Sequence, residues 1–348
     1  MHLDKVLKKV GWDKLKEDVK RRRAAGECVG LGLAYFLEKS GQGPVEGVRV
    51  TVDVTGQVEL ITGAASVGQG METAMAQICA DALGVNYRDV RVIHGRTDRI
   101  DYGFGANAAR VTIMTGSATH IAATKLREKA LEVASAYLVE ATPDQLDVKD
   151  GCIVRKDGRD MPKITLAQVA KELTPATAIA RGREPGLTTE GVFDCEHENF
   201  PFGAHVALVK VDRDTGGVKI ERYFASYDVG VAVNPMMLEG QIAGSVVQGL
   251  GGAMFEEFTY NDDGTPQSVT FADYLLPTMG DIPKLEIFMT EDAPSPLNPL
   301  GLKGGGEAGI TACGAVIATA IEDAIGMKGV INQLPITPQR LKAILRGA

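Results

Sequence analysis

The sequence has 348 residues, a length that allows one large or two medium α/β domains with a sizeable core. Hydrophobic residues make up 45% of the chain and charged residues 24%, a composition that excludes an intrinsically disordered protein. The net charge is −8, and the basic residues are scattered apart from a short run at residues 14–23, which argues against a nucleic-acid partner.

The cysteines and the start of the chain predict a compartment. Five cysteines are spread over the chain without a CxxC pair that would suggest a zinc or iron–sulfur site. The first residues are charged throughout and lack the apolar run of a signal peptide, and we expect no membrane span. These features predict a cytoplasmic protein with reduced thiols. The cysteines are Cys28, Cys79, Cys152, Cys195 and Cys313.

The spacing of apolar residues predicts the elements of the first half of the chain. Residues 3–25 have helical spacing and form a leader before Gly26. Residues 48–60 alternate as a hairpin with a two-residue turn at Thr55 and Gly56, and residues 71–84 form a helix that ends at Gly84. A strand at 90–95, a long helix at 116–139 and a helix at 165–173, begun by Thr165 as its N-cap, follow.

The second half of the chain repeats this order of elements. A strand at 205–211, a turn at 214–217 and a strand at 218–226 predict a second hairpin, before helices at 239–255 and 310–325. The predicted fold is α+β, with two α/β domains that have mixed sheets and glycine-rich loops. We expect a helical leader at 1–29, a first region at 30–180 and a second region at 181–348.

Many of the 41 glycines gather in four turns, at residues 66–70, 102–107, 240–252 and 303–307. Glycine lets a backbone approach a ligand closely, and N–H groups at a helix start can converge on an anionic oxygen. Together the four turns predict the binding site of a large anionic cofactor. The amides of Gln69, Gln241 and Gln248 stand beside these glycines, and they either match the mixed edge of a pterin or only satisfy a backbone group.

Glu307 follows three glycines and precedes the apolar helix, so its carboxylate lies at a tight turn. It is a candidate general base, or alternatively only the first residue of a helix. Gly304, Gly306 and Gly309 also satisfy the GxGxxG fingerprint of dinucleotide binding. The match is weak, because prolines occupy the preceding segment and the acidic residues that follow fall inside the next helix.

The remaining polar candidates are interpreted as structural. Cys195, His197 and His205 do not have the spacing of a metal ligand set. We interpret Cys313 as a core residue and His94 as a satisfied polar group at the end of a strand.

Four segments carry a family resemblance: ASVGQGMETAMAQICADALGV, YGFGANAARVTIMTGSA, YDVGVAVNPMMLEGQIAGSVVQGLGGAMFEE and LKGGGEAGITACGAVIATAIEDAI. In this order they resemble the C-terminal half of the molybdenum-binding subunit of the xanthine dehydrogenase and aldehyde oxidase family, which includes carbon monoxide dehydrogenase. The resemblance runs from about Gly30 to Leu341 and implies the molybdopterin-binding fold of that family. It also implies a molybdenum-dependent oxidoreductase that hydroxylates an aldehyde or an N-heteroaromatic substrate with oxygen from water.

The resemblance assigns roles to residues of this chain. It implies that Glu307 is the base beside molybdenum, that Gln69 and Gln241 contact the pterin, and that residues 106–112 cradle its phosphate. The metal is held by the pterin dithiolene, so no protein ligand to it is expected. The residues assigned to the cofactor are Gly68, Gln69, Gly70, Ala106, Asn107, Ala108, Ala109, Arg110, Val111, Thr112, Gln241, Lys303, Gly304, Gly305 and Gly306.

The resemblance also implies partners, because it covers only the second half of such a subunit. We expect a second molybdenum-binding subunit that carries the N-terminal half, an iron–sulfur subunit with 2Fe-2S clusters, an FAD subunit and a small-molecule substrate. We expect the molybdopterin in its cytosine dinucleotide form.

Two other functions stay open on the sequence alone. One is a non-catalytic molybdopterin-binding or scaffold subunit, against which Glu307 argues, since binding needs no carboxylate near an anionic cofactor. The other is a nicotinamide-dependent dehydrogenase, against which the incomplete dinucleotide fingerprint argues.

Overall fold

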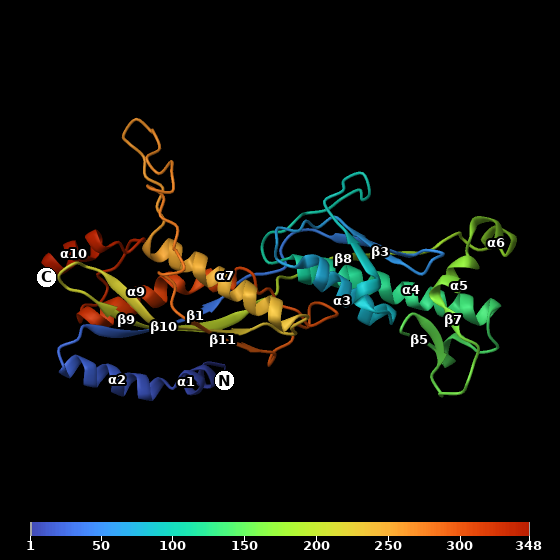
Figure 1. Cartoon of the computed structure of the whole chain (residues 1–348), viewed down its shortest axis with the longest axis horizontal. Coiled ribbons are helices and arrows are strands. Elements are labelled where there is room, and N and C mark those ends of the chain that lie inside the picture. The colour runs from blue at the N-terminus through green and yellow to red at the C-terminus, as the bar shows by residue number, and fades with distance from the viewer. Residues whose placement is uncertain (1, 348) are drawn as a thin grey trace. The chain divides into compact units, whose positions relative to one another are not determined.

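The computed structural model describes residues 2–347. The chain forms two compact units (Figure 1). The first contains the described part of Met1–Lys39, Phe200–Pro294 and Gly305–Ala348, and the second contains Ser40–Asn199 and Ser295–Gly304. Both units are therefore discontinuous in the chain, whereas the sequence suggested consecutive regions at 1–29, 30–180 and 181–348.

The first unit is built on a mixed four-stranded sheet with the order β1-β9-β10-β11. Its strands are β1 (Val29–Leu37), β9 (Phe202–Val211), β10 (Val218–Asp228) and β11 (Leu285–Thr290). Strands β9 and β10 pair antiparallel, which confirms the predicted second hairpin, and β10 and β11 pair parallel.

Helices cover both faces of this sheet (Figure 1). On one face α1 (His2–Val10) and α2 (Trp12–Ala24) bury Val206 and Leu208 of β9. On the other face α7 (Pro235–Met254), α9 (Cys313–Ile325) and α10 (Pro338–Arg346) bury Ala207 and Val209 of the same strand. Because successive side chains of a strand point to opposite faces, an almost continuous apolar run is needed on β9.

Helix α9 packs very closely on β1. A Cβ atom on Gly32 would lie 2.1 Å from the carbonyl oxygen of Val316, and one on Gly30 would lie 2.2 Å from that of Ala320. The two glycines near the start of the VGLGLAYFL strand therefore let the helix approach closely, which fixes this part of β1 against α9.

The second unit has a four-stranded sheet with the order β4-β3-β2-β8. Its strands are β2 (Glu46–Val52), β3 (Val58–Thr62), β4 (Val90–Ile93) and β8 (Leu187–Phe193), and the β3–β4 pair is parallel. Helices α3 (Met71–Leu83) and α4 (Gly116–Tyr137) lie beside it (Figure 1). A small sheet of β5 (Leu146–Lys149), β6 (Cys152–Arg155) and β7 (Ile164–Thr165) follows, with α5 (Leu166–Lys171) and α6 (Pro175–Ala180).

Two local predictions need correction. Strands β2 and β3 form the predicted hairpin, but its turn covers residues 53–57, because the Asp53 carboxylate accepts hydrogen bonds from the N–H groups of Thr55 and Gln57 and stabilises a longer loop. The apolar helix predicted at 310–325 is broken at Ala312 into α8 (Ala308–Thr311) and α9.

Thr165 is the N-cap of α5, with the capping box expected of Thr and Gln at this spacing.

One helical stretch, Ala308–Ile325, has the length and hydropathy that would allow it to cross a membrane. Its apolar side chains, including Val316, Ile317 and Ile321, are buried in the core of the first unit. Packing inside this unit accounts for the apolar composition.

Candidate cofactor site

The first glycine-rich segment forms the loop between β3 and α3 in the second unit. Gly68 and Gly70 have φ of 97° and 80°, backbone conformations that favour glycine. The side-chain oxygen of Gln69 accepts a hydrogen bond from Val67 N at 2.7 Å, and its nitrogen donates to Ala65 O at 3.3 Å. The amide therefore shapes its own loop, and one donor and one acceptor position remain for a ligand.

His94 holds the same loop from β4. Its Nε2 lies 3.0 Å from a carboxylate oxygen of Glu72, and its Nδ1 accepts from Ser66 N at 3.4 Å. The other oxygen of Glu72 accepts from the Ser66 hydroxyl. A hydrogen bond from its own backbone N–H, followed by those with Ser66 and His94, lowers the pKa of the Glu72 carboxyl. The interpretation of His94 as a satisfied polar group is confirmed.

The second glycine-rich segment has an unusual backbone. Ala108 and Ala109 have φ of 47° and 46°, in the left-handed region that costs an L-residue with a side chain about 1–2 kcal/mol. They lead into a π-helical turn, Val111–Thr115, that continues into α4. Strained residues and π-helical turns gather at functional sites, so this loop is a strong candidate for ligand contact.

Arg110 has a structural role in this loop. Its guanidinium is fully buried, pairs with the Glu46 carboxylate at 2.6 Å, and donates to the carbonyl oxygens of Gln42 and Pro44. The side chain is thus committed to protein partners. A contact between residue 110 and a cofactor would come from the main chain.

The second unit brings three of the four glycine-rich segments together. A Cβ atom on Gly63, directly before the first segment, would lie 2.5 Å from Gly103 Cα in the second. Gly304, from the fourth segment, packs against the second in the same way, since its Cβ atom would lie 2.6 Å from Ala109 Cβ. The Gly304 N–H also donates a hydrogen bond to the Ser40 hydroxyl at 3.0 Å.

The first unit holds the third segment and the rest of the fourth. Gln241 lies half-buried in the second turn of α7, and Gln248 is exposed two turns later. A Cβ atom on Gly305 would lie 2.4 Å from Leu238 Cδ1, and one on Gly309 would lie 1.9 Å from Ser245 Oγ, both on α7. The loop that carries Glu307 therefore lies against α7.

Glu307 itself is exposed in the turn before α8. A second carboxylate, Glu38 at the end of β1, lies near it and was not predicted as a site residue. Burial and, secondarily, the negative charge of Glu307 raise the pKa of Glu38 to about 7. In the sequence, Glu38 is a single acidic residue directly after an apolar strand. Such a residue does not by itself indicate that a second carboxylate lies nearby.

Several glycines of these segments face open space. A Cβ atom on Gly68 or Gly105 in the second unit, or on Gly240 or Gly306 in the first, would meet no other atom within 4 Å. In each unit the backbone at these positions can thus be approached by a large ligand. A pterin with its phosphate needs such an approach, so the residues present fit this class of cofactor.

The other polar candidates have ordinary structural roles. Cys313 is fully buried, as predicted, and burial raises the pKa of its thiol to about 12. The Cys195 thiol donates to the carbonyl oxygen of His197, and His205 is buried against the Tyr223 hydroxyl at 2.8 Å.

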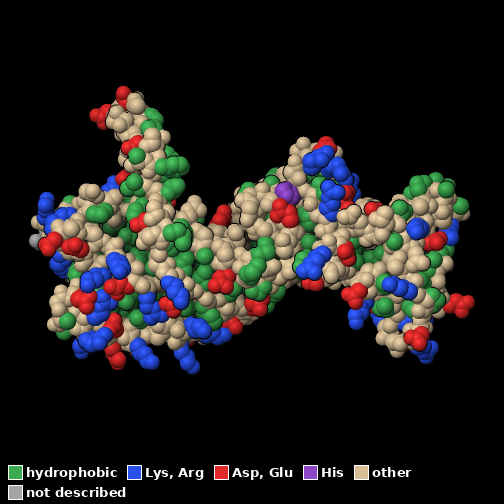
Figure 2. Space-filling view, viewed as in Figure 1, with side chains coloured by type: hydrophobic (Ala, Val, Ile, Leu, Met, Phe, Trp, Pro, Cys, Tyr) green, Lys and Arg blue, Asp and Glu red, His purple; other side chains and the backbone are tan. Residues whose placement is uncertain are grey.

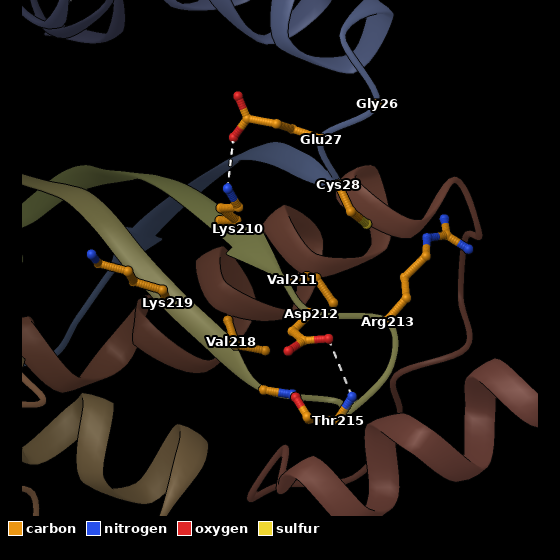
Figure 3. Close-up of a pocket in the computed structure, with 11 residues that line it drawn as sticks. Gly26, Glu27, Cys28, Lys210, Val211, Asp212, Arg213, Thr215, Val218 and Lys219 are labelled. Atoms are coloured by element: carbon orange, nitrogen blue, oxygen red, sulfur yellow. Dashed lines mark hydrogen bonds and ion pairs between the residues drawn. The ribbon is translucent and has the colours of Figure 1, made fainter.

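A surface pocket of the first unit lies between the β9–β10 turn and residues 26–28 (Figure 3). Its charged groups are largely satisfied by protein partners. Lys210 pairs with Glu27 at 2.9 Å, and the Asp212 carboxylate accepts from the N–H groups of Asp214 and Thr215. None of the predicted site residues lines this pocket.

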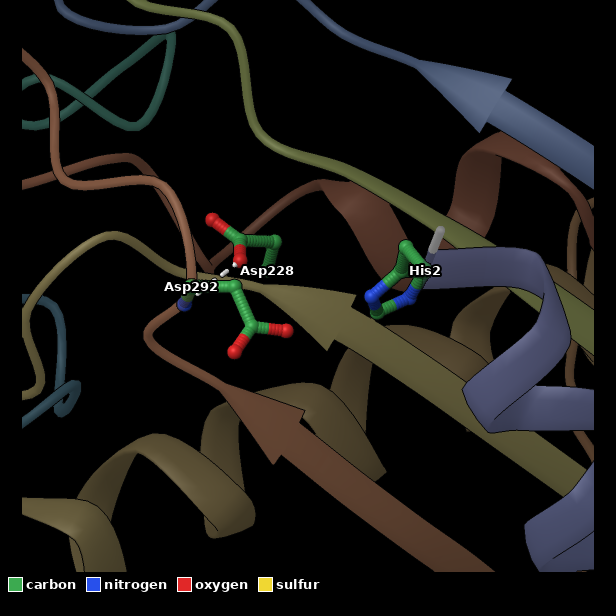
Figure 4. Close-up of side chains that lie close together, drawn as sticks. All are labelled: His2, Asp228 and Asp292. Carbon is green, nitrogen blue, oxygen red and sulfur yellow. Dashed lines mark hydrogen bonds between the residues drawn. The ribbon is translucent and has the colours of Figure 1, made fainter.

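His2, Asp228 and Asp292 form a polar cluster where α1 meets β10 and β11 (Figure 4). The His2 ring lies within 3.1 Å of the Ser226 hydroxyl and 3.3 Å of the Thr290 hydroxyl. Asp228 is buried and accepts from the Thr290 hydroxyl and from Asp292 N, both at 3.0 Å. These hydrogen bonds explain the cluster without a ligand.

Comparison with known proteins identifies the family. A model described as a molybdopterin cofactor-binding domain matches residues 5–283. The chain is 41% identical over 346 residues to the 6-hydroxypseudooxynicotine dehydrogenase complex subunit gamma of Paenarthrobacter nicotinovorans, which covers 99% of this chain and 43% of that protein. It is 32% identical over 341 residues to the carbon monoxide dehydrogenase large chain of Afipia carboxidovorans. This alignment covers 92% of this chain and 41% of that protein.

The fold agrees with these relatives. The structure of quinoline 2-oxidoreductase from Pseudomonas putida 86 aligns with a TM-score of 0.89 and 33% identity, over 99% of this chain and 45% of that one. The predicted α+β fold of the molybdopterin-binding type is confirmed. The chain spans less than half the length of each of these relatives. It belongs to the molybdopterin cofactor-binding domain family of the molybdenum-dependent oxidoreductases related to xanthine dehydrogenase.

Proposed function

We propose that this chain binds a molybdenum–pterin cofactor within a multi-subunit hydroxylase and supplies its general base, Glu307. The observation that carries the proposal is the meeting of three glycine-rich segments in the second unit, through the contacts of Gly63 with Gly103 and of Gly304 with Ala109. The family to which the chain belongs binds molybdopterin, so we take this cofactor as the ligand of the three segments.

In the second unit, the phosphate end of the cofactor would bind at residues 106–112. The first N–H groups of a helix have no partner inside it, and here that helix begins at Val111 after two left-handed alanines. The N–H groups of Val111 and Thr112 are the donors we propose for the phosphate oxygens. The open backbone at Gly105 would leave room for a nucleotide, and we propose the cytosine dinucleotide form.

In the second unit we propose Gln69 as a pterin contact, and in the first unit, taken by itself, Gln241. Gln69 keeps one free donor and one free acceptor, and the side-chain amide of Gln241 makes no hydrogen bond to another described residue. Amides present both kinds of group, as the edge of a pterin requires. Gly68, Gly70 and residues 303–306 would provide the close backbone approach.

When bound, the cofactor would supply the two-electron redox chemistry of a hydroxylation, with water as the source of oxygen. The part of this chain is to take up a proton at the Glu307 carboxylate and to orient the cofactor beside it. A well-placed general base typically contributes about 10²- to 10⁴-fold in rate.

Partner chains would complete the site. Glu307 is exposed, although a base that works in a dry pocket must be covered. An arm at residues 256–283 projects from the first unit and exposes apolar side chains, with Phe271 80% and Met279 93% exposed (Figures 1 and 2). Such a patch is typical of an interaction surface. We propose a polypeptide that supplies the N-terminal half, an iron–sulfur subunit with 2Fe-2S clusters and an FAD subunit, assembled in the cytoplasm.

The substrate we propose is an N-heteroaromatic compound, with an aldehyde as the second candidate. The relative named quinoline 2-oxidoreductase supports the first class. No residue of this chain is assigned to the substrate.

Metal analysis of the complex purified with its partners tests the proposal. We expect about one molybdenum atom per copy of this chain, together with a pterin phosphate. A complex without molybdenum would overturn the proposal. Turnover of a quinoline or pyridine substrate separates an enzyme from the scaffold alternative, since a scaffold would contain molybdenum but give no product.

A further inference from the structure

Residues 256–283 form a preformed arm between α7 and β11 in the first unit (Figure 1). The outer part of the arm doubles back on itself as a short hairpin, in which Gln267 N donates to Thr259 O at 2.8 Å. The Ser268 hydroxyl also donates to the carbonyl oxygen of Glu257 at 2.7 Å. Because these bonds lie within the arm, they satisfy part of its backbone and define its shape.

The foot of the arm is fixed to the helices of the first unit. The Tyr274 hydroxyl donates to the Glu256 carboxylate at 2.6 Å, and a Cβ atom on Gly251 of α7 would lie 1.8 Å from that carboxylate. Arg340 of α10 donates to the Glu257 carboxylate at 2.7 Å. The arm therefore offers a partner a surface that is already organised, which lowers the entropic cost of binding.

The arm exposes apolar side chains that its own hairpin does not cover. Phe271 and Met279 are the most exposed of them, and hydrophobic side chains lie along the arm in Figure 2. A two-stranded ribbon has no second layer on which to bury such groups. Apolar groups exposed together among polar ones are typical of an interaction site. The side chains concerned are those of Phe258, Tyr260, Val269, Phe271, Leu276 and Met279.

The charge of the arm indicates the class of partner. The arm contains six carboxylates and no lysine or arginine, so its net charge is −6. Asp262 and Asp263 lie in the turn that closes the hairpin, and acidic side chains gather at this end of the arm in Figure 2. Nucleic-acid phosphates and anionic lipids repel such an arm, whereas a protein surface with lysine and arginine attracts it. The carboxylates are those of Glu256, Glu257, Asp262, Asp263, Asp273 and Asp281.

A pocket of about 860 Å³ lies at the foot of the arm, within the first unit. Leu275 and Ile282 of the arm line it. Met254 of α7 and Ile336, which precedes α10, also line it. A pocket with apolar side chains in its walls can receive one bulky side chain of a partner, as at the centre of many protein interfaces. Since Leu275 belongs to both the arm and the pocket, the two form one continuous surface.

We infer that the arm and the pocket at its foot bind the polypeptide that supplies the N-terminal half, in an apolar groove of that polypeptide bordered by lysine and arginine. The inference rests on the proposed function, which requires such a polypeptide. The alignment with quinoline 2-oxidoreductase covers 99% of this chain, the arm included, but 45% of that one. More than half of that longer chain lies outside the matched region and is available to cover an apolar arm.

A second copy of this chain is the competing occupant of the surface. Its arm carries the same six carboxylates, so two arms that met would repel each other. The polypeptide with the N-terminal half is therefore favoured, and the two occupants give different results in the following experiments.

The first experiment maps the arm in the assembled complex. The full chain is purified with its partners, and mass spectrometry identifies a polypeptide that matches the half of the relatives outside the aligned region. Amide hydrogen exchange of residues 256–283 is then compared between this complex and the full chain alone. We expect exchange in the arm to be at least about 10-fold slower in the complex. Unchanged exchange would overturn the inference, as would a protected arm in a preparation that contains only copies of this chain.

The second experiment measures how fast the identified polypeptide dissociates from the diluted complex. Phe271→Ser combined with Met279→Ser should raise this rate about 10-fold or more, because the loss of buried apolar contacts acts mainly on dissociation. Ile179→Ser is the matched control, since Ile179 is 71% exposed on α6 in the second unit, and it should leave the rate unchanged. Urea unfolding of the isolated chains verifies that the variants fold. Wild-type dissociation of the double variant would refute the inference.

The third experiment tests the charge of the arm. The Kd of the complex, obtained by dilution at several salt concentrations, should rise with salt in wild type and less steeply in Asp262→Asn combined with Asp263→Asn. Asp144→Asn, an exposed carboxylate of the second unit, should keep the wild-type slope. Equal slopes in all three proteins would contradict a basic border on the partner. A complex that contains the identified polypeptide but no molybdenum would instead overturn the proposed function, and these measurements would still report on the arm.

Discussion

Arg110 and Glu46 form an ion pair with 2.6 Å between Nη1 and Oε2, and both side chains are fully buried in the second unit. The guanidinium also donates to the carbonyl oxygens of Gln42 and Pro44. It therefore ties residues 106–112 to the segment before β2 and maintains the left-handed backbone at Ala108 and Ala109. The ion pair thus holds residues 106–112, which we propose to bind the cofactor phosphate, in their backbone conformation.

Replacing Arg110 with methionine should strongly destabilise the chain. The change leaves the Glu46 carboxylate buried and without its cation, and breaking such a pair costs about 3–5 kcal/mol. Urea unfolding of wild type and Arg110→Met measures the loss. Arg127→Met is the matched control, because its ion pair with Asp147 is about one-third exposed and should contribute less than about 1 kcal/mol. Equal losses in the two variants would contradict the account.

Two glycines of the fourth segment should respond differently to alanine. A Cβ atom on Gly304 would lie 2.5 Å from Ser40 Cβ, so Gly304→Ala should lose about 1–3 kcal/mol of stability through overpacking. A Cβ atom on Gly306 would meet nothing within 4 Å, so Gly306→Ala should fold like wild type.

The Gly306→Ala variant then tests whether the cofactor approaches this glycine. If the cofactor lies against Gly306, the complex with Gly306→Ala should contain less molybdenum and pterin than wild type at unchanged unfolding free energy. Full molybdenum content would mean that the cofactor does not approach this glycine.

His205 should make folding sensitive to acid. Burial lowers its pKa from 6.5 to about 3, so below pH 6.5 the unfolded chain takes up a proton that the folded chain does not. Stability should therefore fall between pH 6.5 and 3, with a contribution of at most about 1.4 kcal/mol per pH unit for one proton. His205→Gln should have a shallower slope than wild type and than the exposed His197→Gln. Parallel slopes for all three proteins would refute this.

Periodicity predicted most of the fold correctly. The helices at 71–84 and 116–139 and the hairpin at 205–226 agree with α3, α4 and the β9–β10 pair, because each carries a long, regular apolar pattern. Two local details were missed: the longer turn, which the Asp53 side chain stabilises, and the break of the apolar helix at Ala312. The small sheet of β5, β6 and β7 was also missed, since its strands have only 2–4 residues.

Glycines and family motifs marked the residues of the candidate site in the sequence, and their contacts with a cofactor stay predictions. Contacts such as Gly304 with Ala109 join residues far apart in the chain, and a single sequence contains no signal for them. The same holds for Arg110, predicted as a cofactor contact, whose buried partner Glu46 lies 64 residues away, and for Glu38, whose neighbour Glu307 is near the other end of the chain.

The most direct test of the account is Glu307→Gln in the purified complex, with molybdenum and pterin content measured beside turnover. An amide keeps the size of the side chain but cannot accept the proton. The account predicts wild-type molybdenum and pterin content with turnover reduced by about 10²- to 10⁴-fold. Wild-type turnover from this variant would contradict the assignment of Glu307 as the base.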